Sequence, residues 1–151
     1  MPDSFDLDII RIVQSNAKIT IKELSENINL SPTPTFERLK KLEKEGFITG
    51  YHAHIDAKKM GFGLIVMCNV SLKNHQKDMI EKFQEEIVRF DEVHECYHIA
   101  GMYDYLLKVV EKDMDSYQHF VSKKLASLDN IANVQSSFVM TELKRDTGLK
   151  V

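Results

Sequence analysis

Apolar residues recur at helical spacing in three short segments at the start of the chain. The segments cover residues 4–14, 20–29 and 32–45, and each places apolar side chains on one face of a helix with 3.6 residues per turn. Polar and charged residues fill the opposite faces. The pattern predicts a three-helix domain. The inward faces are predicted to hold Ile9, Ile10 and Val13; Ile21, Leu24 and Ile28; and Thr35, Phe36, Leu39 and Leu42.

Residues at the predicted helix ends indicate how the second and third helices are joined. Thr20 and Glu23 have capping-box spacing, in which each side chain satisfies a backbone N–H of the other residue. Asn29 accepts a left-handed backbone, and Ser31 is a favoured N-cap residue. Gly46 is placed to end the third helix. A tight turn between two short helices is the helix-turn-helix arrangement.

The outer face of the third helix carries hydroxyls and cations, as a helix that enters a DNA major groove does. An amphipathic helix with external lysines can also be a solvated surface, and the pattern alone leaves both interpretations open. Residues 1–50 contain seven Lys/Arg and eight Asp/Glu, so any electrostatic footprint must be local. The candidate DNA-binding residues are Ser31, Thr33, Thr35, Glu37, Arg38, Lys40, Lys41 and Lys44.

The pattern changes after a hinge-like segment. Residues 47–55 favour a strand or small wing, and residues 54–60 are predicted to link a DNA-binding domain (1–53) to a second domain (61–151). Strands are expected at 64–72, 93–100, 105–110 and 134–143, and helices at 78–90 and 114–128. The order β-α-β-β-α-β is the ferredoxin-like unit. The predicted class is α+β, with an N-terminal three-helix winged helix-turn-helix domain and a C-terminal ferredoxin-like βαββαβ domain.

Two strands of the second domain are apolar on both predicted faces. Along the strands of an antiparallel sheet with one solvated face, apolar and polar residues alternate regularly. This alternation is weak around Ile65, Met67, Leu107 and Val109. A second copy of the same sheet is the simplest cover for the extra apolar face. We therefore expect a homodimer.

Several spaced motifs occur in one order along nearly the whole chain. Together they resemble the Lrp/AsnC (leucine-responsive and asparagine-responsive, or feast/famine) family of transcriptional regulators. The motifs are Asp6 with Ile9-Ile10, Glu23-Leu24, Asn29-Leu30-Ser31, RLKKLE at 38–43, Gly46-Phe47-Ile48, Gly50-Tyr51, Asp56, Gly61 and GMYDY at 101–105. The resemblance implies a double-stranded DNA partner, an amino-acid effector, and dimers that assemble into tetramers, octamers or discs.

The segment Gly101, Met102, Tyr103 and Asp104 is the candidate effector loop. The residues alone fit a plain turn, in which Asp104 bonds nearby backbone. The resemblance instead implies an effector site beside this loop at the dimer interface. There Asp104 could accept hydrogen bonds from an ammonium group, and loop N–H groups could donate to a carboxylate. Polar residues at the start of the last strand are further candidates: Gln135, Ser136 and Ser137.

Composition and motifs exclude several other classes. The longest apolar run, residues 62–68, is far short of a membrane span, which needs about 20 residues. An acidic, polar start is unlike a secretory signal, and two distant cysteines suit a reducing cytoplasm. His94, Cys96 and His98 would share one face of a strand, but we expect ordinary side chains there and no metal. No nucleotide-binding or hydrolase motif occurs, so neither cofactor nor catalysis is predicted. An architectural DNA-binding protein that ignores small molecules, or less readily an enzyme on the ferredoxin-like domain, is the alternative.

Overall fold

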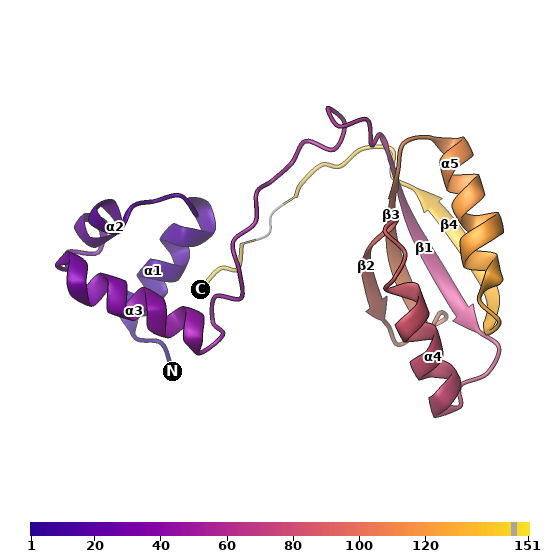
Figure 1. Ribbon diagram of the computed structural model, residues 1–151, viewed down its shortest axis with the longest axis horizontal. Helices are drawn as coiled ribbons and strands as arrows, with labels where there is room; N and C mark the ends of the chain where they lie inside the picture. The colour runs from indigo at the N-terminus through magenta and orange to yellow at the C-terminus, as the bar shows by residue number, and fades with distance from the viewer. Residues whose placement is uncertain (146–147) are drawn as a thin grey trace. The chain divides into compact units, whose positions relative to one another are not determined.

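The computed structural model describes residues 1–145 and 148–151, which form two compact units (Figure 1). The first unit joins Met1–His54 to Lys144–Val151, and the second is Ile55–Leu143. The predicted division into 1–53, 54–60 and 61–151 differs mainly at the end of the chain. Residues 144–151 group with the helical unit and not with the ferredoxin-like one.

The first unit contains α1 (Ser4–Ser15), α2 (Ile21–Asn27) and α3 (Pro32–Lys44). Side-chain caps fix the starts of two of these helices, because Asp3 with Asp6, and Thr20 with Glu23, form capping boxes. The helices bury one apolar stripe each, as the spacing predicts. The buried core consists of Ile9, Val13, Leu24, Ile28 and Leu42.

The turns around α3 have the backbone that the sequence indicates. Asn29 has φ of 55° and Gly46 has φ of 78°, both in the left-handed region. The structure assigns no strand to residues 47–55, where a strand or small wing was predicted. The N–H groups of Phe47 and Ile48 instead donate to Leu42 O at 3.0 and 3.2 Å, which folds this segment back on the end of α3.

The last residues of the chain lie against α1. The Gln14 side chain pairs with the backbone of Leu149, donating from Nε2 to O at 3.1 Å and accepting from N at 2.6 Å. Arg11 Nε donates to Val151 O at 2.6 Å. Residues 148–151 are therefore held to the helical unit by contacts with backbone atoms, a tail clamp that no sequence periodicity predicts.

The second unit is a four-stranded antiparallel sheet in the order β2-β3-β1-β4 (Figure 1). The strands are β1 (Leu64–Leu72), β2 (Val93–His98), β3 (Tyr105–Glu111) and β4 (Ile131–Phe138), and the helices are α4 (Lys77–Ile87) and α5 (Met114–His119). This is the predicted βαββαβ order. The last strand was predicted at 134–143, but it begins earlier, at Ile131, and also ends earlier, at Phe138.

Helices α4 and α5 share one hydrophobic core with the sheet. Phe83 of α4 and Phe120 after α5 pack in one buried cluster with Val66, Leu107 and Val109 of the strands. The second helix is more irregular than predicted: α5 continues as a π-helix at Phe120–Lys124 and a 3-10 turn at Leu125–Ser127. Among the described residues, no helix could cross a membrane.

The opposite sheet face combines apolar and polar side chains. The four residues named in the dimer prediction lie on two different faces of the sheet, because side chains alternate along a strand. Leu107 and Val109 are fully buried in the core on the helix side, whereas Ile65 and Met67 are half-buried on the opposite face. A charged pair also lies on this second face: Lys108 Nζ is 2.7 Å from Glu95 Oε1, and Tyr97 OH donates to Glu95 Oε2 at 2.7 Å.

Candidate nucleic-acid interface and effector site

Helix α3 presents one mostly polar face to solvent. Its N-cap is Ser31, whose carbonyl accepts from Thr35 N–H and Thr35 Oγ1, and Pro32 occupies the first turn, where a missing N–H costs nothing. Two lysines lie in the last turn, where a cation interacts favourably with the helix dipole. The exposed side chains of the helix are Pro32, Thr33, Phe36, Glu37, Lys40, Lys41 and Lys44.

Two of the predicted DNA-binding residues do not lie free on this face. Thr35 is completely buried, and its hydroxyl donates to Ser31 O at 2.9 Å. The guanidinium of Arg38 lies 2.7 Å from both Asp3 and Asp6, and Asp6 is buried. Hydrogen bonds to Asp3 and then Asp6 raise the pKa of Arg38. Arg38 thus connects α3 to the start of α1.

Phe36 was predicted to face inward, but it is 47% exposed. On a helix with 3.6 residues per turn, position 36 lies about 120° from Leu42 and only about 40° from Lys40. The inward prediction for Phe36 was wrong because it relied on the apolar character of the residue, whereas helix geometry places the ring among the polar residues.

A short chain of contacts joins α3 to the segment that follows it. Lys40 Nζ is 2.7 Å from Glu43 Oε2, and Tyr51 OH donates to Glu43 Oε1 at 3.0 Å. Burial, followed by the Glu43 carboxylate, raises the pKa of Tyr51 to about 12. Lys40 is consequently paired within the protein, whereas Lys41 and Lys44 form no ion pair with any residue that the structure describes.

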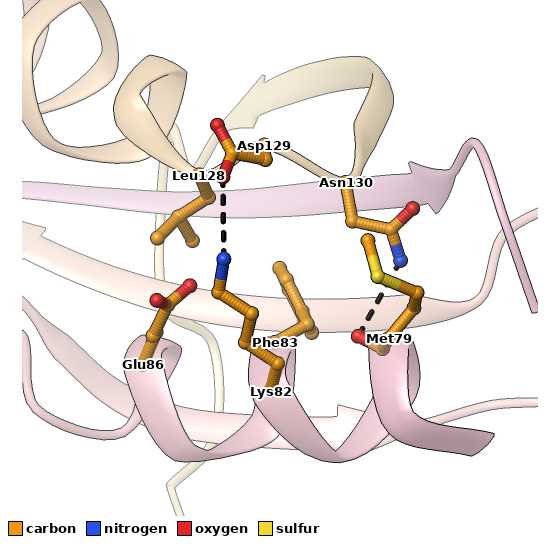
Figure 2. Close-up of a pocket in the computed structure, with 7 residues that line it drawn as sticks. All are labelled: Met79, Lys82, Phe83, Glu86, Leu128, Asp129 and Asn130. Atoms are coloured by element: carbon orange, nitrogen blue, oxygen red, sulfur yellow. Dashed lines mark hydrogen bonds and ion pairs between the residues drawn. The ribbon is translucent and has the colours of Figure 1, made fainter. Parts of the chain in front are cut away.

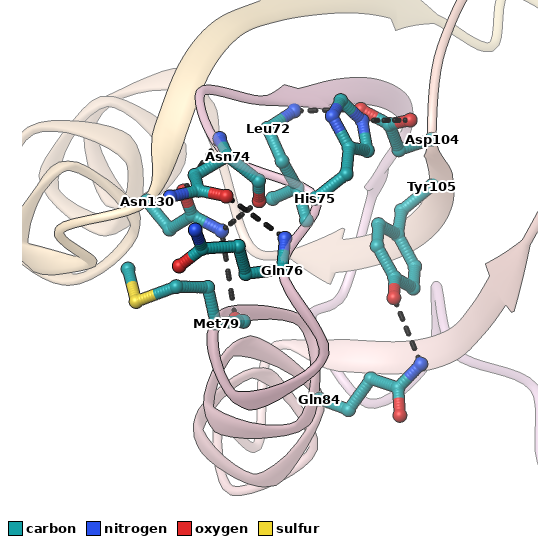
Figure 3. A network of polar contacts seen from close by, with 9 residues as sticks. All are labelled: Leu72, Asn74, His75, Gln76, Met79, Gln84, Asp104, Tyr105 and Asn130. Carbon is teal, nitrogen blue, oxygen red and sulfur yellow. Dashed lines mark hydrogen bonds and ion pairs between the residues drawn. The ribbon is translucent and has the colours of Figure 1, made fainter.

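The 101–104 loop is anchored through Asp104 (Figure 3). The Leu72 N–H donates to Asp104 Oδ2 at 2.7 Å, and His75 Nε2 lies 2.8 Å from Asp104 Oδ1. The Leu72 N–H, and after it the His75 ring, hold the pKa of Asp104 below its ordinary value. At the other end of the loop, Gly101 has φ of 153°, which L side chains rarely adopt. The charge at position 104 is therefore held in one place.

The predicted polar residues of β4 divide between two environments. Tyr103 OH donates to Gln135 Oε1, which connects the loop to β4 across the sheet. Ser136 instead bonds with Tyr117 OH, which also lies 3.1 Å from the buried Cys68 sulfur. Register places Gln135 opposite Asn69 and Ser137 opposite Met67, on the face away from Cys68. Gln135, and not Ser136, belongs with the loop.

His75 is a loop contact that sequence reasoning missed. It lies 29 residues before Asp104, in the segment between β1 and α4, and no motif joins the two positions. The same segment is fixed by Asn130, whose side chain donates to Asn74 O at 2.9 Å and accepts from Asn74 N at 3.0 Å. Polar side chains thus hold this segment beside the loop (Figure 3).

The depression between α4 and the start of β4 is too closed to hold a ligand (Figure 2). Lys82 Nζ and Asp129 Oδ2 close it at 3.2 Å, and no space for a water-sized sphere remains. No cluster of three potential metal ligands occurs among residues 1–145 and 148–151. His98, one of the histidines considered for metal, stacks on the Tyr105 ring with centroids 4.8 Å apart.

A helix-turn-helix unit and a ferredoxin-like unit with an anchored acidic loop define a DNA-binding protein with a separate ligand-binding domain. Family models support both halves: residues 2–49 match winged helix-turn-helix DNA-binding, and residues 65–149 match the Lrp/AsnC ligand binding domain. The chain belongs to the Lrp/AsnC family of DNA-binding transcriptional regulators.

Relatives match nearly the whole length of the chain. It is 35% identical to a proline dehydrogenase transcriptional activator of Rhizobium radiobacter, covering 97% of this chain and 94% of the relative. It is 32% identical to the leucine-responsive regulatory protein of Escherichia coli K12, covering 99% and 91%. A transcriptional regulator of Neisseria meningitidis solved in complex with L-Met is 36% identical, with a TM-score of 0.94 and coverage of 99% and 96%.

Proposed function

We propose that this regulator responds to a free amino acid that binds beside the 101–104 loop. The observation that carries the proposal is the anchored carboxylate of Asp104, fixed by Leu72 and His75 at a loop of the ligand-binding domain. The relative from Neisseria meningitidis, whose structure holds L-Met, makes an amino acid the first class of ligand to test.

The chemistry of the loop suits a zwitterion. A carboxylate offers about four lone-pair sites, and Leu72 and His75 use two of those of Asp104, so capacity remains for an ammonium group. Backbone N–H groups of the loop would donate to the ligand carboxylate. Tyr103 and Gln135, which bond to each other, would form the adjoining polar wall. Gly101 and Met102 complete the proposed site, and Ser137 is a more distant member.

The second sheet face supports a homodimer as the working unit. Ile65 and Met67 are half-buried there, and the charge of Lys108 is already neutralised by Glu95 within one chain. Packing two such faces would bury apolar surface without leaving that cation unpaired, and about 1,600 Å² is a standard interface. Higher assemblies of dimers, up to octamers, follow from the family and are part of the proposal.

A dimer would bring two α3 helices to successive turns of one face of duplex DNA, about 34–36 Å apart. Ser31, Thr33 and Glu37 lie where base contacts concentrate, and Lys40, Lys41 and Lys44 lie further along, where phosphate contacts are expected. Effector binding would change the spacing of the two helices or the population of oligomers. The free thiols of Cys68 and Cys96 fit a cytoplasmic regulator, and catalysis is not part of the proposal.

A thermal-shift screen against the free amino acids tests the effector proposal. A ligand present at about a hundred times its dissociation constant should add about 2.7 kcal/mol to the free energy of unfolding. Stabilisation by one or a few amino acids supports the site. If none stabilises the protein while DNA still binds, an architectural protein that does not sense amino acids is the better description.

A further inference from the structure

Phe36 is an exposed aromatic residue on an otherwise polar helix face. It is 47% exposed, and it is absent from the apolar residues that pack around the core of the helical unit, although its neighbour Leu39 is among them. Exposed aromatic surface costs free energy in water, and burial against another apolar group recovers it. The ring therefore has a physical reason to meet a partner outside the domain.

The position of the ring is restrained. Lys40 Nζ lies over it, 5.7 Å from its centroid, and the same nitrogen is held by Glu43 at 2.7 Å. One face of the ring is thus covered by a cation, which attracts the ring electrostatically. Phe36 lies about 60° from Thr33 around the helix, so both project to the side that faces bases in a helix-turn-helix complex.

The other exposed side chains of α3 offer few ways to recognise a base in the major groove. Arg and Lys pair best with guanine, and Asn and Gln pair best with adenine. Helix α3 contains no Asn or Gln, Arg38 is engaged by Asp3 and Asp6, and the two lysines without an ion pair lie in the last turn, away from the N-terminal half that contacts bases. Glu37 can accept from cytosine. Thymine carries a C5-methyl group in the major groove, which apolar side chains including Phe contact.

We infer that Phe36 reads thymine by packing its ring against the C5-methyl group of that base in the major groove. It is a specificity-determining residue, one that changes which sequence is bound more than whether DNA is bound. The inference rests on the DNA-binding function and adds to it the chemical group that α3 recognises.

The test exchanges thymidine for deoxyuridine, which differs only by the missing C5-methyl group. A preferred duplex is first selected by the full-length protein from double-stranded DNA with a randomised centre. It is then resynthesised with single deoxyuridine substitutions at each thymine. Binding constants of the wild type, Phe36→Ala and Lys44→Ala are measured at low salt, where phosphate contacts keep weak affinities measurable.

The wild type should lose affinity about 4-fold at one thymine in each half-site, the effect of leaving one methyl group unburied. Phe36→Ala should bind more weakly and change less than 1.5-fold with the same deoxyuridine. Lys44→Ala, the matched control on the same helix, should bind more weakly yet keep the full response to the methyl group.

Three results would overturn the inference while leaving DNA binding intact: a selected duplex without thymine in the contacted positions, a wild type indifferent to deoxyuridine, or an equal response in wild type and Phe36→Ala. Failure of the wild type to bind any duplex would instead refute the regulatory function itself. Circular dichroism of Phe36→Ala should match the wild type, since this exposed ring is not part of the core.

Discussion

Replacing Asp104 by Asn separates the structural role of this residue from its proposed ligand role. The carboxylate accepts from Leu72 N–H at 2.7 Å and lies 2.8 Å from His75, and its side chain is 23% exposed. Asn keeps one oxygen for Leu72 and has nearly the same shape, but it lacks the negative charge. Any change therefore reports the charge and not the presence of a side chain.

The expected loss of stability follows from the hydrogen bonds. A hydrogen bond to a charged group contributes about 1.5–3 kcal/mol and a neutral one about 0.5–1.5 kcal/mol, so Asp104→Asn should cost about 1 kcal/mol. A unit of about 90 residues unfolds with an entropy near 0.19 kcal/mol/K, which converts this loss to a fall in Tm of about 5 °C. Asp104→Ala also removes the acceptor of the Leu72 N–H, and about 2–4 kcal/mol should lower Tm by about 10–20 °C.

Calorimetric titration with the amino acid that stabilises the wild type then measures the ligand role. Loss of an ammonium–carboxylate hydrogen bond should weaken binding at least about 10-fold. His75→Ala is the matched control, because it removes a hydrogen-bond partner of Asp104 and leaves the charge of Asp104 in place. It should lower Tm by a similar amount and change the ligand Kd less than about 2-fold.

Two results would refute the reasoning about Asp104. If Asp104→Asn binds the ligand with the same Kd as the wild type, another group must accept the hydrogen bonds of the ligand ammonium. An unchanged Tm in Asp104→Ala would show that the contacts with Leu72 and His75 do not anchor the loop.

The remaining predictions concern DNA affinity, assembly, packing and pH. Lys41→Ala should reduce the salt dependence of DNA binding by about one unit in gel-shift titrations, and Lys40→Ala should reduce it less, because Glu43 already pairs with Lys40; equal slopes would contradict this. Met67→Asp, which places a charge on the second sheet face, should shift the protein towards monomer in light scattering at micromolar concentration, and an unaltered mass would exclude that face as the interface. Phe120→Ala, at a fully buried ring, should lower the free energy of unfolding by about 3–5 kcal/mol in urea titrations, and a loss below about 1 kcal/mol would deny it a core role. Because Asp104 has a lowered pKa, its stabilising contribution is fully present above the ordinary value of 3.8 and is lost as pH falls through the lower folded value; unfolding followed from pH 5 to pH 2 should show a shallower decline for Asp104→Asn than for the wild type.

Local rules predicted the elements of this protein well. Capping at Thr20, the left-handed Asn29 and the βαββαβ order all follow from short-range chemistry and periodicity, and the structure has each of them. Predictions that inferred the facing of a side chain from its residue type alone were less accurate. Thr35 was predicted both on the inward face and as a DNA contact, and its burial agrees only with the first of these. Phe36 was predicted inward but is exposed, because helix geometry and not side-chain class fixes which way a residue faces.

Contacts between residues distant in sequence could not be predicted at all. Nothing near His75 indicates that it meets Asp104, and nothing in Arg38 distinguishes a bridge to Asp3 from a contact with DNA. Strand ends were misplaced for the same reason, since the register of β4 against β1 decides where pairing stops. Such features come from tertiary packing, which overrides local preference.

The tail clamp has a consequence for how the protein is made. Gln14 leaves the ribosome 135 residues before Leu149, its backbone partner. The last of the three helices ends at Lys44, so at about 5–20 residues per second all three exist for roughly 5–21 s before Leu149 has been synthesised. During that interval the nascent chain has its helix-turn-helix core but not its clamp, so the helical unit is completed only after the whole ferredoxin-like unit has been synthesised.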